Sequence, residues 1–146
     1  MPELEMHRSL DQLGKFSVTV TVDTERRLPD EEVEELLGKM LERVGRRCLD
    51  EGAGLIGHIK AYAQDRGEGM CSANLTSFRV GVESENRLGG EGWQEGDIML
   101  HVIVHGLWDP EVRKLTLDEL QGVMGEHGLR YRILRDYFEG GPADDA

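Results

Sequence analysis

The sequence predicts an α+β fold, a two-layer sandwich in which a mixed, mostly antiparallel sheet carries both helices on one face. Residues 15–24 alternate apolar and polar side chains without a break, as a half-buried strand does. Residues 29–51 place apolar side chains at the three- and four-residue spacing of a helix. Residues 97–107 (DIMLHVIVHGL) alternate as a strand that is largely apolar on both faces.

The size of the chain fits one domain. It has 146 residues, and its apolar share of 38% is enough for a hydrophobic core. We expect a polar lead-in over residues 1–14, a single domain over residues 15–138 and a disordered acidic tail over residues 139–146. No apolar run approaches the roughly 20 residues that span a bilayer. The acidic start of the chain lacks the apolar stretch of a signal peptide, so we expect a cytoplasmic protein.

The formal net charge of −12 limits the classes of partner. A nucleic-acid partner requires a cationic surface that displaces counterions, and an anionic membrane attracts basic segments. We therefore expect neither as a partner. Cys48 and Cys71 lie far apart and have no metal-ligand spacing, so we expect two reduced thiols and no disulfide. No motif indicates a cofactor.

The helix predicted over residues 29–51 should lie across the sheet. Pro29 suits its first turn, where a backbone N–H would be unsatisfied in any case. Acidic residues gather near its start and arginines near its end, in the order that the helix dipole favours. The apolar stripe consists of Val33, Leu36, Leu37, Met40, Leu41, Val44 and Cys48.

Two further strands are predicted before the central one. They span residues 55–64 and 70–83, and a short hairpin loop joins them. The alternation shifts in parity near Thr76, which indicates a β-bulge. Residues 84–96 are rich in glycine and lack periodicity, so we expect a flexible loop that contains Trp93.

A second helix is predicted over residues 117–126, after a connector. Thr116 is the expected N-cap, because Glu119 would complete a capping box. The segment 129–138 is ambiguous between strand and helix. We favour a strand, because a helix followed by glycine and a returning strand is a common end to an α+β sandwich.

The predicted element order is β-α-β-β-β-α-β, a variant of the ferredoxin-like arrangement with one strand more. A right-handed crossover over the first helix should bring the second strand parallel to the first. The second, third and fourth strands should then form a meander. Both helices are expected on one face of the sheet, which leaves the other face uncovered.

The uncovered face is the expected ligand or partner surface. Apolar and aromatic groups on an exposed sheet face are typical of such a surface. The alternative is that a loop or the N-terminal segment folds over it. The residues expected there are His58, Tyr62, Met99, His101, Ile103, His105 and Trp108.

The histidines do not by themselves predict a metal site. On a strand, His101 and His105 are separated by about 13 Å, too far to bind one ion. A metal would need one of them together with His58 and an acid such as Asp109. Satisfied histidines at the edge of a packed face, or a pH-sensitive contact, are the other interpretations. We therefore predict no metal ligands.

No catalytic residue can be assigned from the sequence. Cys71 or Ser72 could pair with a histidine on a neighbouring strand, but no nucleophile elbow surrounds either residue. The segment 52–57 (GAGLIG) matches G-x-G-x-x-G, yet a helix precedes it and a strand follows. Phosphate binding by this motif needs the reverse context, so we interpret the glycines as a helix stop and a bulge or close backbone approach.

Two hypotheses for the function follow. The first is a small non-enzymatic binding or assembly module that self-associates, as a dimer, or binds a partner through the open sheet face. The second is a small-molecule or metal-dependent enzyme that uses a histidine and tyrosine cluster on that face. The sequence alone does not decide whether the protein is an enzyme.

Overall fold

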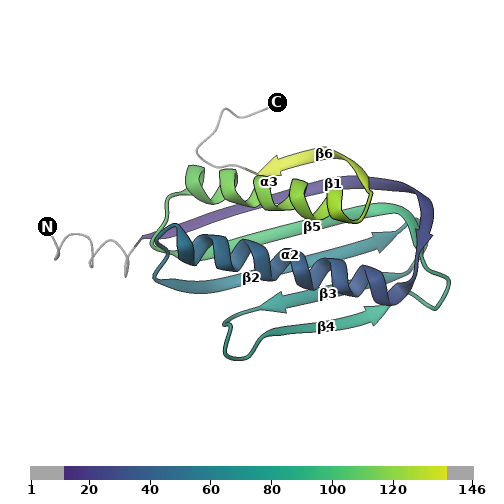
Figure 1. Ribbon diagram of the computed structural model, residues 1–146, viewed down its shortest axis with the longest axis horizontal. Coiled ribbons are helices and arrows are strands. Elements are labelled where there is room, and N and C mark those ends of the chain that lie inside the picture. Colours follow the sequence, from purple (N-terminus) through teal and green to yellow (C-terminus); the bar gives the residue numbers. More distant parts are fainter. Residues whose placement is uncertain (1–11, 138–146) are drawn as a thin grey trace, which may run out of the picture.

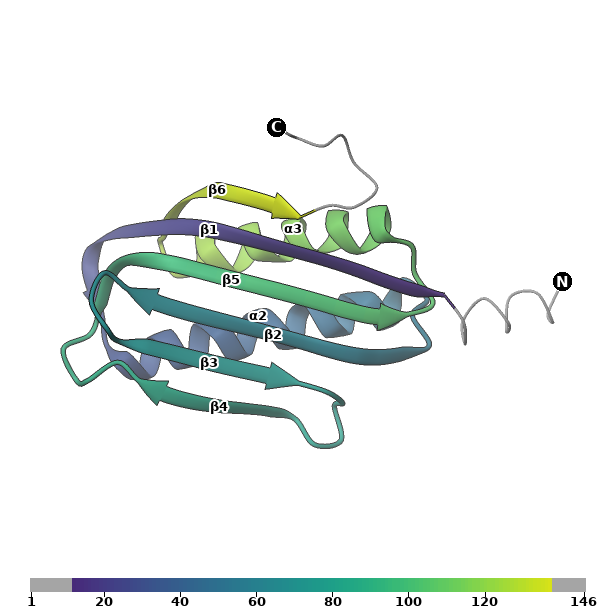
Figure 2. The same cartoon turned by 180° about the vertical axis from the view of Figure 1, so that it is seen from behind.

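The computed structural model describes residues 12–137, which form one six-stranded sheet with two helices on one face (Figure 1). The elements in chain order are β1 (Leu13–Leu28), α2 (Asp30–Asp50), β2 (Leu55–Asp65), β3 (Met70–Leu75), β4 (Val82–Arg87), β5 (Trp93–His105), α3 (Asp109–Glu126) and β6 (Arg130–Tyr137). Among the described residues, no helix covers the other face (Figure 2). The predicted two-layer α+β sandwich is confirmed. Most of the expected lead-in and all of the expected tail lie outside the described residues.

The strands lie in the order β4-β3-β2-β5-β1-β6, and every neighbouring pair is antiparallel. β2 runs parallel to β1, as expected, but β5 lies between them and pairs with both in the antiparallel sense. The expected mixed sheet is therefore wrong, because no two neighbouring strands are parallel. The expected meander is also wrong, because β5 does not pair with β3 but lies on the other side of β2. A central position gives the long β5 a hydrogen-bonding partner on each edge. β1 is also longer than predicted and continues through the expected turn at residues 25–28.

β4 is a strand that the sequence did not predict. The sequence predicts one strand over residues 70–83, but β3 ends at Leu75 and the chain turns back to form β4 beside it. Gly81 in this turn has a φ of 85°, a conformation that glycine adopts without steric cost. β4 is an edge strand with the polar sequence VESENR, so it lacks the apolar alternation of a half-buried strand.

The glycine-rich segment before β5 is shorter than predicted. The sequence predicts a loop over residues 84–96, whereas β5 begins at Trp93, which pairs with Leu28 of β1. The Trp93 side chain is fully buried. Its indole occupies the space that a side chain at Gly96 would need, because a β carbon there would lie 2.8 Å from Trp93 Nε1.

α3 begins earlier than predicted. The sequence places a connector and an N-cap at Thr116, but the helix begins at Asp109. The Glu111 carboxylate accepts a hydrogen bond of 2.7 Å from the backbone N–H of Trp108, and Pro110 occupies the first turn, where a missing N–H has no cost. Thr116 lies inside the helix and is fully buried. Its hydroxyl has no hydrogen-bond partner among the described residues.

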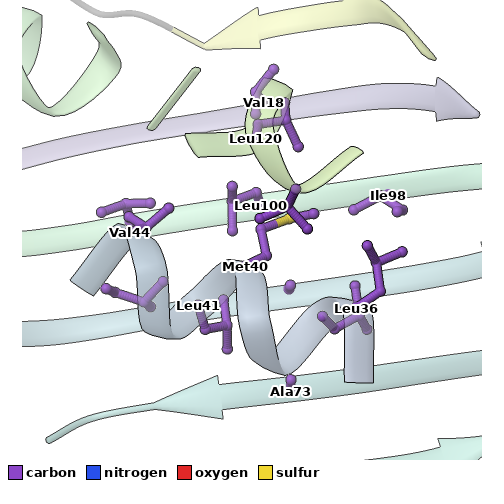
Figure 3. Packing of buried hydrophobic residues seen from close by; sticks show 14 of the residues in the cluster. Val18, Leu36, Met40, Leu41, Val44, Ala73, Ile98, Leu100 and Leu120 are labelled. Carbon is purple, nitrogen blue, oxygen red and sulfur yellow. The ribbon is translucent and has the colours of Figure 1, made fainter. Parts of the chain in front are cut away.

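The core fills the space between the sheet and the two helices (Figure 3). Val18 of β1 and Leu100 of β5 point toward Met40 of α2 and Leu120 of α3. Fully burying one such side chain contributes roughly 1.5–3 kcal/mol. The predicted apolar stripe of the first helix is buried along its whole length, as are the predicted inward positions of the first and central strands: Phe16, Val18, Val20, Val22, Ile98, Leu100, Val102 and Val104.

Residues Arg130–Tyr137 form β6, so the preference for a strand over a helix is confirmed. β6 is an outer strand beside β1, and a register shift opposite Thr19 and Val20 interrupts its alternation. Ile133 is 43% exposed and Leu134 is 49% exposed. This irregularity and exposure explain why the sequence pattern is ambiguous there.

Ion pairs tie the outer surfaces of α2 and α3 together. Arg47 of α2 donates a hydrogen bond of 3.0 Å to Glu119 of α3, the residue expected to complete a capping box with Thr116. His127, after α3, lies 2.9 Å from the Glu32 carboxylate of α2. Such partly exposed pairs each contribute about 0–1 kcal/mol, so the buried core remains the main source of stability. Neither helix is long and apolar enough to cross a bilayer.

Replacing Gly96 with alanine should destabilise the protein by about 3 kcal/mol, the upper range for overpacking a core. The added β carbon would overlap the Gln64 carbonyl oxygen and press on the Trp93 indole. Urea denaturation measures the loss. Gly125→Ala in α3 is the matched control, because a β carbon there meets nothing within 4 Å. An equal effect of the two substitutions would contradict this account of the packing around Gly96.

Replacing Thr116 with valine should stabilise the protein by about 1 kcal/mol, because it removes a buried hydroxyl without a partner and keeps the side-chain shape. Thermal and urea denaturation of the variant measure the gain. A loss of stability would indicate that the hydroxyl is hydrogen-bonded in solution.

Candidate functional site

The surface of the sheet that faces away from α2 and α3, called here the open face, carries the predicted site residues. The strand register sets Tyr62 of β2 opposite Met99 of β5 and His58 opposite Ile103. His101 and His105 follow the same alternation on β5. All of the predicted residues except Trp108 therefore lie together on this face, in the order that an antiparallel β2–β5 pair imposes.

Trp108 lies elsewhere. It directly precedes α3 and belongs to the connection between β5 and that helix, where its backbone carbonyl accepts a hydrogen bond of 3.0 Å from Val112 N–H. Its side chain is 47% exposed. The turn through Gly106, which has a φ of 106°, ends β5 before Trp108, so the sheet alternation does not extend to it.

The centre of the open face is polar and basic. His101 is flanked in the register by Ser17 of β1 and Lys60 of β2, and Ser17 Oγ forms a hydrogen bond with His101 Nδ1. Burial lowers the pKa of His101 below its usual value, and the nearby charges of His58, Lys60 and Lys15 lower it further. The imidazole is therefore neutral at pH 7. We call Lys15, His58, Lys60 and His101 the basic cluster.

A β-bulge positions His58. The β2–β5 register shifts between Ile56 and His58, and a β carbon on Gly57 would lie 2.9 Å from the Ile103 carbonyl oxygen. The predicted bulge or close approach at Gly57 is thus confirmed. His58 Nε2 lies 2.9 Å from Asn74 Oδ1 of β3, and this hydrogen bond fixes the ring. The bulge directs His58 to the same face as His101.

Half-exposed apolar side chains adjoin the basic cluster. Met99, opposite Tyr62, is 41% exposed. At the end of the face, Leu13 and Leu55 pair with His105 from either side and are 40% and 61% exposed. The polar centre therefore lies within a band of accessible apolar surface, which is typical of a partner surface.

The hypothesis of a metal-dependent enzyme finds no ligand set. Among residues 12–137, no group of three histidine, cysteine or acidic side chains is arranged to hold a metal ion. Asp109, the suggested acidic ligand, accepts a hydrogen bond of 2.9 Å from the backbone N–H of Lys15 instead. His58 and His101 share the face with Lys60, whose positive charge disfavours a cation.

The suggested cysteine nucleophile is on the wrong side of the sheet. Cys71 points into the core and is fully buried, and burial raises its pKa to about 11. Cys48 on α2 is equally buried, with a pKa of about 12. Ser72 lies on the open face opposite Tyr62, and no hydrogen bond connects it to a histidine among those described. The hydroxyl that does contact His101 is that of Ser17.

Sequence reasoning missed Ser17 as a site residue. The strand alternation correctly assigned it to an outward position. Its neighbour, however, depends on the pairing of β1 with β5, which the sequence did not reveal. Lys60 was missed for the same reason, since its contact with the cluster arises from the β2–β5 register.

A cavity of about 410 Å³ lies near the start of β5, away from the basic cluster. It is lined by charged residues of both signs, among them Asp23, Arg27, Asp65 and Arg66, together with Trp93. None of the residues predicted for a site lines it. The Arg66 side chain donates hydrogen bonds to Asp97 and Thr21.

Comparison with models of known protein families, with characterised proteins and with solved structures finds no match to this chain.

Both cysteines should resist alkylation in the folded protein. The thiolate is the reactive form, and burial of Cys48 and Cys71 both excludes the reagent and raises each pKa far above 7. Iodoacetamide at pH 8, followed by mass spectrometry, should give no adduct in buffer and two adducts in denaturant. Rapid labelling of Cys71 in buffer would contradict its position in the core.

Proposed function

We propose that the protein is a non-enzymatic assembly module that forms a dimer through its open face. The observation that carries this proposal is the band of half-exposed apolar residues on a face that no described helix covers. Met99 and Ile103 of β5 lie on either side of His101, and Tyr62 of β2 lies opposite Met99. Burying such surface contributes about 25 cal/mol per Å² of apolar area.

The dimensions of the face suit a second copy. At standard spacings, six strands are about 24 Å wide and a strand of β5's length is about 40 Å long. The central strands thus offer an area comparable with the roughly 800 Å² that each partner buries in a typical stable interface.

The charge distribution favours the open face over the rest of the surface for self-association. A chain with a net charge of −12 repels its own copies through any acidic face. On the open face, cations and acids are close to balanced. The cations are Lys15, Lys60, Arg66, Arg87, Arg130, Arg132 and Arg135, and the acids are Asp23, Glu83, Glu85, Glu95 and Asp97.

The outer strands suggest how the two copies are oriented. β6, at one edge, presents Arg132 and Arg135 to the open face, and β4, at the opposite edge, presents Glu83, Glu85 and Arg87. A twofold axis parallel to the strands would set β6 of one copy over β4 of the other. The register would then set Arg135 of each copy over Glu85 of the other, and Arg132 level with Arg87, which is itself paired with Glu85. An axis perpendicular to the strands would instead oppose β6 to β6, and arginine to arginine.

One observation favours the alternative of a small-molecule enzyme. The hydrogen bond between Ser17 and His101 resembles a nucleophile and its base. The described groups around His101 are cationic or neutral, and none is a carboxylate that would orient the imidazole and stabilise its protonated form. The assembly function is therefore the better supported of the two.

Sedimentation equilibrium tests the proposal. The wild-type chain should dimerise with a dissociation constant on the order of 10 µM or tighter. Met99→Asp should weaken the dimer at least tenfold, because it places an unpaired charge at the centre of the contact. Val80→Asp is the control, since Val80 is 60% exposed in the turn before β4 and outside the open face. A wild-type monomer at about 100 µM would exclude self-association and leave a different partner as the occupant.

Charge reversal at the edges tests the orientation. Arg135→Glu should weaken the dimer, because it would face Glu85 of the second copy. Adding Glu85→Arg to the same chain should restore it. If the double variant is weaker than either single variant, the proposed twofold axis is wrong, although association through the face could persist.

A further inference from the structure

The basic cluster is unexpected in so acidic a chain. Lys60 and His101 are neighbours in the β2–β5 register, and Lys15 and His58 are close enough for their charges to act on His101. The next acid along β5 on this face, Asp97, is held by Arg66 at 3.2 Å. No described carboxylate is paired with Lys60 in the register or by an ion pair.

The surrounding contacts hold the cluster in place. Ser17 Oγ bonds His101 Nδ1, and Asn74 bonds His58 Nε2. The Lys60 ammonium lies 5.8 Å from the centre of the Tyr62 ring, within the range of a cation–π contact. When the Ser17 hydroxyl donates to Nδ1, the proton of neutral His101 is on Nε2, which is then available as a donor.

We propose that the basic cluster binds the phosphate group of a small molecule, with Lys60 and His101 as its principal donors. Lysine and histidine are compact donors that suit a tetrahedral oxyanion approached from several sides. Arginine, whose planar fork suits a carboxylate, is absent from the cluster. A phosphate carries a charge of about −1.5 to −2 at pH 7, which would complement the positive charge of Lys60.

The bound phosphate should also change the titration of His101. The cations near His101, from β1 and β2, disfavour its protonated form. An anion among them favours that form, so the pKa of His101 should rise when the site is filled. The groups that face His101 are Lys15 and Ser17 of β1, and His58 and Lys60 of β2. On β5 itself the titratable groups of this face are Asp97 and His105, each four residues and about 13 Å away.

The site requires the residues of one chain only, so it goes beyond the proposed dimer and does not depend on it. In that dimer, however, the twofold axis would set His101 of one copy near Lys60 of the other. A bound oxyanion would then reduce the repulsion between the two clusters, and it would be enclosed between the two sheets.

The test is an NMR titration of the full-length protein with inorganic phosphate and with sulfate, at constant ionic strength set by chloride. The imidazole signal of His101 is assigned by its loss in His101→Gln. We expect saturable shifts with both anions and a higher pKa of His101 in sulfate. Lys60→Met should weaken binding at least fivefold. Lys114→Met, which removes an exposed lysine on α3, is the charge-matched control and should leave binding unchanged.

Three outcomes would overturn the phosphate site. They are shifts that rise linearly without saturation, shifts that acetate reproduces at the same concentration, and equal effects of the two lysine substitutions. Sedimentation of the same samples separates this proposal from the previous one. If the protein is a monomer and binds phosphate saturably, the dimer is excluded and the phosphate site is retained. If it is a dimer and binds neither phosphate nor sulfate, the phosphate site is excluded and the dimer is retained.

Discussion

The pairing of β5 with β1 on one edge and with β2 on the other is the constraint on which the rest of the structure depends. It is antiparallel on both sides, and the side chains of β5 alternate between the two faces. The even-numbered positions from Ile98 to Val104 therefore meet the helices, and the odd-numbered positions from Asp97 to His105 reach the open face. A slip of one residue in either pairing would exchange these two sets.

Glycines and bulges maintain that register where the chain would otherwise clash. Gly57 lets β2 approach the Ile103 carbonyl closely, and the bulge there directs His58 to the open face. Gly96 leaves room for the Trp93 indole beneath β5. The core and the candidate site are thus linked, because the same local irregularities that allow close packing on the helix side determine which polar groups meet on the other side.

The two faces of the sheet differ in how they are completed. The helix side is closed by α2 and α3, whose outer surfaces are tied by partly exposed ion pairs such as Arg47 with Glu119. The open side combines a basic centre, adjoining apolar side chains and oppositely charged edges. Self-association and phosphate binding would satisfy different parts of this surface, the apolar band and the charged edges in one case and the basic cluster in the other.

The sequence by itself determined the fold class, the buried stripe of α2 and the alternation of β1 and β5. These depend on local periodicity, which a chain shows whatever its strand order. It also placed six of the candidate residues, His58, Tyr62, Met99, His101, Ile103 and His105, on one face. Only the tertiary structure decided that β5 lies between β1 and β2, that β4 exists and that Ser17 and Lys60 flank His101. The reason is physical. Strand order and register arise from pairing between residues far apart in the chain. A polar edge strand such as β4 is mostly exposed, so its sequence lacks the alternation of apolar and polar residues by which a strand is predicted.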